Sequence, residues 1–323
     1  MIGMKVSYMI ATRNRREELL KTLAACREQE YPDKEVHVVD DGSSDGTFQA
    51  VQSHFPEVIV TRNECSIGSV ASRNQILARV TGDVLIGFDD DSRFINCGAT
   101  ASVVERFRRE PDLGVLVFQD IGPEYPARIP ENSPARFHGE RHVSSFAASR
   151  YAIRRAVVQK TGQFAHFFWH AYEEPDLAIR VWDSGYRCLE WYEILVWHEF
   201  STLNRNERRT HYFHARNELL SCLMRTPLPL IVPLVAWRMF SQLRYSFGRG
   251  WWTVELKVWW DALRMIPLAV KHRRPVAMET LRRCLLLNRR KVADPVEVWA
   301  LGGIARRGKS PPIADRCKDG VRT

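Results

Sequence analysis

The sequence VLIGFDDD occupies residues 84–91 and runs from apolar side chains directly into three consecutive aspartates. A short apolar run of this kind is typical of a buried strand, and the carboxylates come where that strand is expected to end. Adjacent carboxylates repel one another and raise each other's pKa unless a cation neutralises them. Because oxygen ligands select hard ions such as Mg²⁺ or Mn²⁺, the stretch predicts a divalent-cation site. The alternative is a solvated acidic turn.

Two earlier apolar runs also end in polar residues. The run at 6–10 leads into Thr12-Arg13-Asn14, and the run at 35–39 leads into DDGSSDG at 40–46. Between the apolar runs lie three segments, at 17–29, 47–54 and 69–79, in which apolar residues recur at helical spacing. Further strands are expected at 114–119, 146–153 and 188–196. This alternation predicts an α/β fold with a Rossmann-like, mostly parallel sheet flanked by helices. Ligands bind such sheets at the carboxyl ends of the strands, where the polar clusters are expected to meet.

The pair Asp40-Asp41 admits two interpretations. A carboxylate just past a strand can accept a hydrogen bond from the N3–H of a uracil or thymine ring. The alternative is a capping cluster, since Asp, Ser and Gly after a strand often only begin a helix. In that case Ser44 or Asp45 is the expected N-cap of the helix at 47–54. Two adjacent carboxylates are more than a cap requires.

Charge and cysteine usage limit the class of protein. The formal net charge of +9 indicates anionic partners: nucleic acid, an anionic membrane or a phosphorylated substrate. Seven cysteines without a CxxC pair argue against a disulfide framework and a structural zinc site, and indicate a cytoplasmic location. We expect no signal peptide, because a strand-like segment begins at once. We expect no spanning helix, because no apolar run reaches about 18 residues.

The character of the sequence changes after about residue 204. Apolar residues at 227–240 are interrupted by prolines, and four tryptophans follow between 251 and 260 among basic side chains. We expect an α/β catalytic domain at 1–204, a helical, basic and Trp-rich appendage at 205–305, and a disordered tail at 306–323. Tryptophan and arginine at the headgroup level predict peripheral contact with the inner face of the plasma membrane. The alternative is a helical subdomain whose aromatic side chains pack on the catalytic domain.

Taken together, the first part of the chain, about 200 residues, resembles family 2 glycosyltransferases, which have the GT-A fold. The resemblance rests on these motifs: Val6-Ser7 with Thr12-Arg13-Asn14, the run at 39–47, Gly68 with Ser72-Arg73-Asn74, the aspartates at 89–91, Glu173-Glu174-Pro175-Asp176-Leu177 with Arg180, and Gly185-Tyr186-Arg187. Two positions depart from the family pattern. Many members have Pro where this chain has Ala11, and the usual general base is Asp where this chain has Glu174. Glu173 and Asp176 therefore remain alternatives for the base.

The resemblance implies an inverting enzyme that transfers a sugar, of hexosyl or rhamnosyl type, from a UDP or dTDP donor to a hydroxyl acceptor. The implied acceptor is a glycan or glycolipid in cell-surface polysaccharide or glycolipid synthesis. The implied roles are Asp41 on the pyrimidine base, Ala11 and Arg13 along base and ribose, Arg73 near the donor phosphates, Asp90 close to the ribose, Asp89, Asp91 and His198 on Mn²⁺ or Mg²⁺, and Glu174 as general base. For His198 the alternative is a core or surface histidine.

Three other functions fit the sequence less well. A nucleotidyltransferase also uses carboxylate-bound metal, but it usually has an early Gly-rich phosphate loop, and residues 11–16 contain no glycine. A basic nucleic-acid-binding protein would account for the charge, but the basic residues lie apart from any recognisable nucleic-acid module. We therefore expect no nucleic-acid partner. The intact acidic clusters argue against a degenerate, non-catalytic binding protein.

Overall fold

The computed structural model describes residues 3–122, 139–201 and 206–301. The first part alternates strands with helices: β1 (Val6–Thr12), α1 (Arg16–Arg27), β2 (Lys34–Asp40), α2 (Thr47–His54), β3 (Ile59–Arg62), α3 (Ser69–Leu77) and β4 (Val84–Asp89). The middle part contains β5 (Ser92–Phe94), α4 (Ala99–Arg109), β6 (Leu113–Ile121), β7 (Glu140–His142), β8 (Tyr151–Arg154), α5 (Arg155–Thr161), the short 3₁₀ helix η2 (His166–Phe168), α6 (Glu173–Asp183) and β9 (Arg187–His198). The last part is helical: α7 (Glu207–Arg225), α8 (Leu228–Phe247), α9 (Trp252–Arg264), α10 (Ile266–Lys271), α11 (Met278–Leu287) and α12 (Pro295–Ala300).

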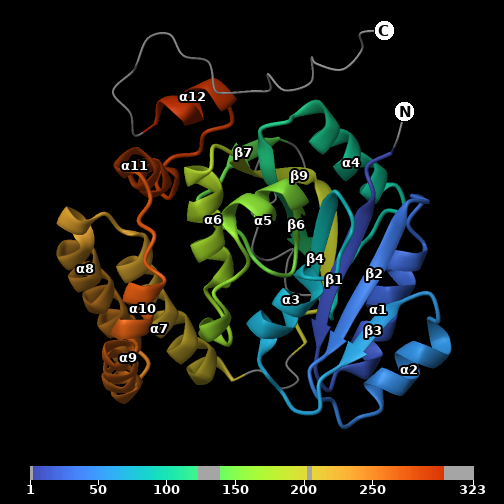
Figure 1. Cartoon of the computed structure of the whole chain (residues 1–323), viewed down its shortest axis with the longest axis horizontal. Coiled ribbons are helices and arrows are strands. Elements are labelled where there is room, and N and C mark those ends of the chain that lie inside the picture. The colour runs from blue at the N-terminus through green and yellow to red at the C-terminus, as the bar shows by residue number, and fades with distance from the viewer. Residues whose placement is uncertain (1–2, 123–138, 202–205, 302–323) are drawn as a thin grey trace, which may run out of the picture.

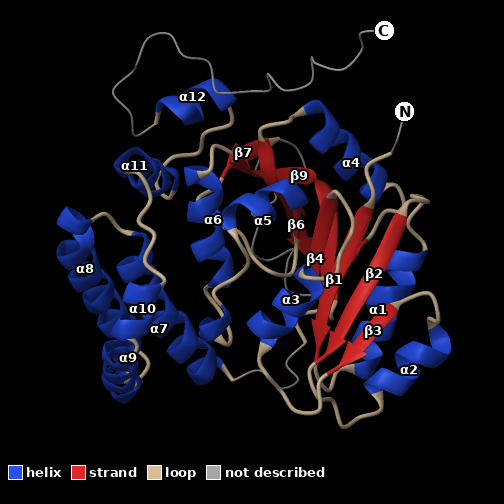
Figure 2. Cartoon of the chain, viewed as in Figure 1, coloured by secondary structure: helices blue, strands red, loops and turns tan. Residues whose placement is uncertain are grey.

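One sheet forms the centre of the molecule, in the order β3-β2-β1-β4-β8-β6-β9-β5 with β7 paired to β9, and helices flank it (Figure 2). β1 to β4 are parallel, whereas β8 runs antiparallel to both β4 and β6. The predicted α/β fold is therefore confirmed. Thr12 pairs with Asp40, and Ala11 pairs with Asp89. This register brings the polar ends of β1, β2 and β4 to one edge of the sheet, as predicted.

Two local predictions are wrong. The strand expected at 146–153 begins only at Tyr151, where it pairs with Gly87 of β4. A Cβ on Gly87 would lie 2.3 Å from the ring of Tyr151, so the missing side chain makes room for that ring. The N-cap of α2 is Gly46, at a φ of 81°, and not Ser44 or Asp45. The Asp45 carboxylate instead accepts a hydrogen bond from the backbone N–H of Thr47 at 3.1 Å.

Side chains of the central strands alternate between two apolar layers. On β1, Tyr8 and Ile10 pack into the layer that contains residues of α1 and α4, and Met9 packs into the opposite layer with residues of α3 and α6. This is the two-residue period of a strand buried on both faces. Each large apolar side chain buried in this way stabilises the fold by about 1.5–3 kcal/mol. The sheet is therefore a rigid platform for the residues at its edge.

The C-terminal helices lie beside the sheet on the side away from β3 (Figure 1). α7 packs against α8 and α9 through a small apolar cluster that includes Leu219 and Val258. The layer on the α3 and α6 side also continues into these helices, since Leu220, Met224 and Leu287 belong to it. Within the described ranges, none of the helices has the length and apolar character needed to cross a bilayer. The tail predicted at 306–323 lies outside the described residues.

Candidate active site

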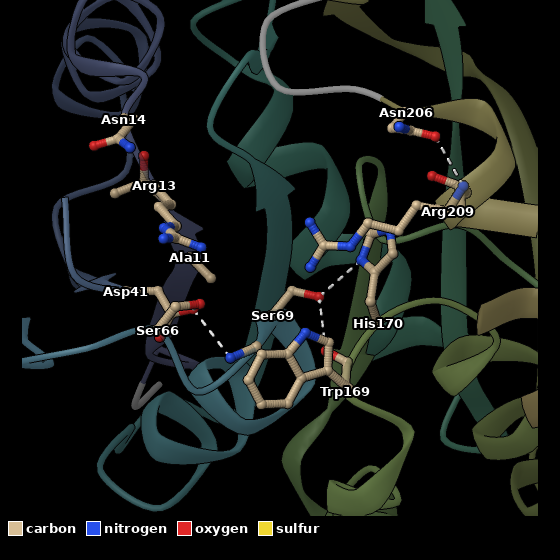
Figure 3. A pocket seen from close by; sticks show the side chains of 13 residues that line it. Ala11, Arg13, Asn14, Asp41, Ser66, Ser69, Trp169, His170, Asn206 and Arg209 are labelled. Carbon is tan, nitrogen blue, oxygen red and sulfur yellow. Dashed lines mark hydrogen bonds between the residues drawn. The ribbon is translucent and has the colours of Figure 1, made fainter. Parts of the chain in front are cut away.

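A cavity of about 390 Å³ opens at the carboxyl edge of the sheet. Its walls come from the loops after β1 and β2, the start of α3, the segment before α6 and the first turn of α7, with these residues: Ala11, Thr12, Arg13, Asn14, Asp41, Ser66, Gly68, Ser69, Trp169, His170, Asn206, Arg209 and Thr210. Asp41 and Arg209 stand on opposite sides of it (Figure 3). Three residues predicted to contact the nucleotide, Ala11, Arg13 and Asp41, line this cavity. Arg73 and Asp90 do not.

Asp41 organises the loop that precedes α3. Its Oδ1 accepts hydrogen bonds from the Asn63 side chain and the Ile67 N–H, both at 2.9 Å, and its Oδ2 accepts from Ser66 Oγ at 2.6 Å and the Gly68 N–H at 3.1 Å. Burial opposes the charge, but these hydrogen bonds outweigh it and lower the pKa of Asp41. The residue is therefore an ionised acceptor that faces the cavity and holds the cavity wall at the same time.

Gly68 is needed where that wall meets the segment before α6. Its φ is +93°, and a Cβ at this position would lie 2.6 Å from the carbonyl oxygen of Trp169. Only glycine tolerates both this backbone conformation and this close approach. The glycine of the Gly68 motif thus lets the Trp169 segment close over the start of α3.

The aspartates after β4 point in different directions. Asp90 is buried, accepts hydrogen bonds from Thr12 Oγ1 and Arg15 Nη1, both at 2.8 Å, and its backbone carbonyl accepts from Thr22. Burial raises the pKa of Asp90 to about 6, against the opposing effect of Arg15. Its carboxylate thus connects the first loop to the acidic stretch. The contact between Asp90 and a ribose stays a prediction.

Asp89, Asp91 and His198 form a group that could hold a metal ion. One ligand atom from each of the three lies within 4.8 Å of the others. The topology explains the meeting, because β5 pairs antiparallel with β9 and sets Ser92, the residue after Asp91, opposite His198. His198 Nε2 lies 3.3 Å from Asp91 Oδ1. Two carboxylates and one imidazole suit divalent ions such as Mn²⁺ and Mg²⁺, so the donor set fits the predicted cation.

The surroundings of His198 favour its charged form in the metal-free protein. Burial alone would lower its pKa, but hydrogen bonds to Asp120 and Asp91 outweigh burial and raise the pKa to about 9. Asp91 also accepts a hydrogen bond from the Ser201 N–H at 3.0 Å. Because metal ligands must be deprotonated, a cation entering this group displaces the His198 proton.

Arg73 connects the metal-binding group to the acidic start of α6. Its Nη2 donates to Asp89 Oδ1 at 2.8 Å, its Nη1 donates to Glu173 Oε1, and Nη1 lies 3.6 Å from Glu174. Burial opposes the charge of the guanidinium, but the three carboxylates outweigh burial and raise the pKa of Arg73. Arg73 therefore neutralises carboxylates from two distant parts of the chain.

The three candidates for a general base have different environments. Asp176 is fully buried, and both of its oxygens are bound, by Ser221, Arg225 and Arg180, so it joins α6 to α7. Glu173 is only 1% exposed and is bound by Arg73. Glu174 is 7% exposed, and burial together with the neighbouring Glu173 raises its pKa well above the usual value for glutamate. Glu174 is therefore the candidate best prepared to accept a proton.

The segment before α6 has an unusual backbone. Trp169, Ala171 and Tyr172 have φ values of 66°, 62° and 70°, in the left-handed region that costs most non-glycine residues free energy. Asn217, buried in α7, compensates for this. Its side-chain amide donates to the carbonyls of three residues at 2.8–3.0 Å, namely Phe168, His170 and Ala171. α7 thus holds the segment that carries part of the cavity wall and leads into Glu173 and Glu174.

Sequence reasoning missed several of these residues. Arg15 and Asp120 lie beside the predicted ligands, and Trp169, His170, Asn206 and Arg209 line the cavity. For Arg15 a signal existed, since it directly follows Thr12-Arg13-Asn14 in the first polar loop. For Asn217 there was none, because a polar residue inside a helix is ordinarily taken to face solvent.

Known proteins resemble this chain in sequence and in fold. A sequence model of glycosyl transferase family 2 matches residues 7–172, more than half of the chain. The chain is 39% identical over 92 residues to the uncharacterized glycosyltransferase YfnE of Bacillus subtilis, a match that covers 27% of this chain and 23% of YfnE. The TarS 1–349 structure from S. aureus superposes with a TM-score of 0.59 at 18% identity, and the match covers 88% of this chain and 87% of that one. The mannosyltransferase PcManGT from Pyrobaculum calidifontis gives a TM-score of 0.55 at 17% identity, covering 82% and 88%.

These findings differ in what they establish. The aligned segment spans less than a quarter of the length of YfnE, so that relative says nothing about the rest of this chain. The likeness to the two solved structures establishes the architecture, and the predicted GT-A fold with C-terminal helices is confirmed. The family model covers β1 to β4, the aspartates and the segment up to Tyr172. This chain belongs to glycosyl transferase family 2.

Proposed function

We propose that the protein is an inverting glycosyltransferase that moves a sugar from a nucleoside-diphosphate donor to a hydroxyl acceptor. The observation that carries the proposal is the meeting of Asp89, Asp91 and His198 at the sheet edge that also bears Asp41 and its cavity. The proposed donor is a UDP- or dTDP-sugar. TarS has been solved in complex with UDP and with UDP-GlcNAc, which supports a UDP-sugar donor. PcManGT has been solved in complex with GDP-Man and Mn²⁺, which supports a nucleotide sugar together with a divalent cation.

The proposed donor site uses the predicted residues. Asp41 accepts a hydrogen bond from the pyrimidine N3–H, and Ala11 and Arg13 line the base and ribose. Asp89, Asp91 and His198 hold a Mn²⁺ or Mg²⁺ ion, which when bound offsets charge on the departing diphosphate. Arg73, already bound to Asp89 at 2.8 Å, orients that carboxylate.

The proposed chemistry at the acceptor is a single displacement. Glu174 removes the proton from the acceptor hydroxyl, and the oxygen forms a bond to the anomeric carbon as the bond from that carbon to the diphosphate breaks on the opposite face. The configuration of the sugar is therefore inverted. The position of Glu174 supports this role, since it lies in the first turn of α6 with its carboxylate 3.6 Å from Arg73 Nη1, and burial together with the neighbouring Glu173 raises its pKa above that of an ordinary glutamate.

We also propose roles for the two parts of the chain, an acceptor and a cellular location. We assign catalysis to residues 1–204 and a supporting role to the helices of 205–305. The transferred sugar is of hexosyl or rhamnosyl type, and the acceptor is a glycan or glycolipid of the cell surface. The enzyme works in the cytoplasm at the inner face of the plasma membrane. The basic and aromatic side chains of the C-terminal helices support this setting.

The proposal is tested by a screen of nucleotide sugars with Mn²⁺ or Mg²⁺ that measures released nucleoside diphosphate in the presence of candidate acceptors. We expect metal-dependent release with one donor, and its loss in Asp91→Ala and Glu174→Ala. Full turnover by both variants would disprove the site, and a product with retained anomeric configuration would disprove the single displacement.

A further inference from the structure

The apolar side chains on the surface are concentrated in one part of the molecule. Of sixteen large hydrophobic residues exposed in the described ranges, eleven lie between residues 228 and 270. That segment comprises α8, α9 and α10, at the side of the molecule away from the edge strand β3 (Figure 1). Scattered exposed hydrophobics are normal, but a contiguous group marks a binding surface.

The exposed side chains of α9 form a stripe. Trp252, Leu256, Trp260 and Leu263 recur at helical spacing and are each more than half exposed, so they share one face of the helix. The opposite face, with Val254, Val258 and Ala262, packs on α7. The stripe is therefore not the buried side of the helix. It is a second apolar face that no described residue covers.

The neighbouring helix α8 repeats this arrangement. Val232, Trp237, Phe240 and Phe247 are between 59% and 77% exposed, and α8 packs beside α9. The buried residues of α8 are polar, Gln242 and Ser246, and Gln242 donates to the Ala215 carbonyl and to Glu218 of α7. Val235 and Met239 pack inward against the cluster shared with α7 and α9, while the four exposed side chains leave a second apolar face of α8 in solvent.

The charges on this surface are of one sign. Between residues 228 and 274 the sequence has only two acidic residues, Glu255 and Asp261. Glu255 is fully buried against His211 and Ser246, and Asp261 accepts a hydrogen bond from Tyr212 at 2.6 Å. Six basic residues in the same segment are exposed: Arg244, Arg249, Lys257, Arg264, Lys271 and Arg274. The exposed charged side chains of this segment are thus all basic, because Glu255 is buried and Asp261 is half-buried.

We propose that the outer faces of α8 and α9 bind the surface of an anionic lipid bilayer. Trp, Phe and Leu enter the boundary between headgroups and acyl chains, and Arg and Lys contact lipid phosphates, as in interfacial amphipathic helices. A second copy of the chain fits this surface poorly, because a two-fold contact would set the cations of one copy against those of the other. An anionic membrane supplies both the apolar layer and the missing negative charge.

The surface lies next to the cavity. Arg208, in the first turn of α7, donates to Thr253 Oγ1 at the start of α9 at 3.0 Å. The neighbouring residues Asn206, Arg209 and Thr210 line the cavity. A bilayer bound along α8 and α9 would therefore bring the cavity close to the headgroup layer, where an acceptor carried by a lipid is found. Membrane binding itself does not depend on the proposed transferase activity.

The test is flotation of the full chain with vesicles of pure phosphatidylcholine and with vesicles containing phosphatidylglycerol, without sugar or metal. We expect binding to the anionic vesicles that weakens as salt is added. Trp237→Ser with Trp260→Ser, and separately Arg244→Glu with Lys257→Glu, are expected to weaken the partition coefficient at least about tenfold. The control, Ile95→Ser with Val296→Ser, removes exposed apolar side chains from other surfaces and should bind like the wild type.

Three results would overturn the proposal. The first is a wild-type protein that does not float with anionic vesicles at low salt. The second is equal binding by the wild type and the charge-reversed variant, which remains decisive if the tryptophan variant does not fold. The third is self-association of the wild type, measured by sedimentation, that the same substitutions abolish, since this would make the surface an interface between copies. Circular dichroism and thermal melting check each variant, and release of diphosphate measures the proposed activity separately.

Discussion

The guanidinium of Arg73 lies 2.8 Å from the carboxylate of Asp89 and ties α3 to the end of β4. Its other terminal nitrogen contacts Glu173 at the start of α6. Asp89, which is expected to bind the metal ion, and the turn that carries Glu174 are thereby joined through the partly buried guanidinium of Arg73.

Replacing Arg73 should affect stability and catalysis together. Arg73→Ala leaves the buried carboxylate of Glu173 without its partner, and loss of one member of a buried pair costs about 3–5 kcal/mol. Asp89, whose side chain is 30% exposed, also loses a partner but at a smaller cost. We expect a reduced free energy of unfolding in denaturant titrations and a kcat/KM at least about 100-fold lower. Arg108→Ala is the control, because its pair with Glu105 is about half exposed and should contribute less than about 1 kcal/mol. An Arg73→Ala protein as stable and active as the wild type would show that the contacts of Arg73 with Asp89 and Glu173 are not needed.

Removing one carboxylate of the metal-binding group should lower the affinity for the divalent cation. Asp91→Asn keeps the size of the side chain but removes the charge that a hard ion requires. We expect the Kd for Mn²⁺, measured by calorimetry, to rise at least about 100-fold, and the added thermal stability that Mn²⁺ confers to disappear. Asp33→Asn, an exposed change away from the cavity, should bind Mn²⁺ like the wild type. Equal affinities in all three proteins would place the ion elsewhere.

Substitutions of the two glutamates at the start of α6 should have different effects on the kinetics. Glu174→Gln removes the proposed base, so kcat should fall by about 10²–10⁴ while the donor KM stays near the wild-type value. The base must be deprotonated to act, so wild-type kcat/KM should fall as the pH drops through the raised pKa of Glu174.

Glu173→Gln tests the cause of that shift. It removes a like charge that raises the pKa of Glu174, and the acidic limb of the pH profile should therefore move to lower pH. A profile that does not move, or a Glu174→Gln protein with wild-type kcat, would assign the base to another residue.

The clamp formed by Asn217 should be required for an ordered cavity wall. Asn217→Asp keeps the shape but removes the N–H groups that hold the carbonyls of Phe168, His170 and Ala171. We expect a loss of about 1–3 kcal/mol in stability and faster hydrogen exchange in residues 168–172, together with a lower kcat. Asn288→Asp alters an asparagine whose bond to Ser144 is exposed and should leave both unchanged. Unaltered exchange in Asn217→Asp would show that the backbone conformation holds without the clamp.

The parts of the site that lie at strand ends could be predicted from the sequence. Apolar runs that end in Asp40-Asp41 and in Asp89 mark parallel strands, and parallel strands necessarily bring such ends to one edge. The family motifs then implied a role for each carboxylate, and these roles stay predictions. The pairing that brings His198 to Asp91 was anticipated only through the resemblance, because β5 has three residues and no visible period.

The remaining features depend on contacts between distant residues. β8 begins at Tyr151 because Gly87 leaves room for its ring, which the pattern at 146–153 does not reveal. A helical appendage at 205–305 was predicted, but the inward direction of Asn217 in α7 depends on carbonyls 46–49 residues away. The roles of Glu173 and Asp176 could be told apart only once Arg73 and Arg225 were seen to bind them.

The position of Asn217 has a consequence for how this protein can be altered. The part that matches the family ends at residue 172, yet the amide that secures the backbone just before that point belongs to α7. Exchanging the C-terminal helices for those of a relative would therefore also exchange the residue that holds part of the cavity wall. In a chimera joined at the end of the family match, the protein that supplies the helices sets the backbone geometry of the segment before α6. Engineering of this scaffold should therefore take α6 and α7 from one parent.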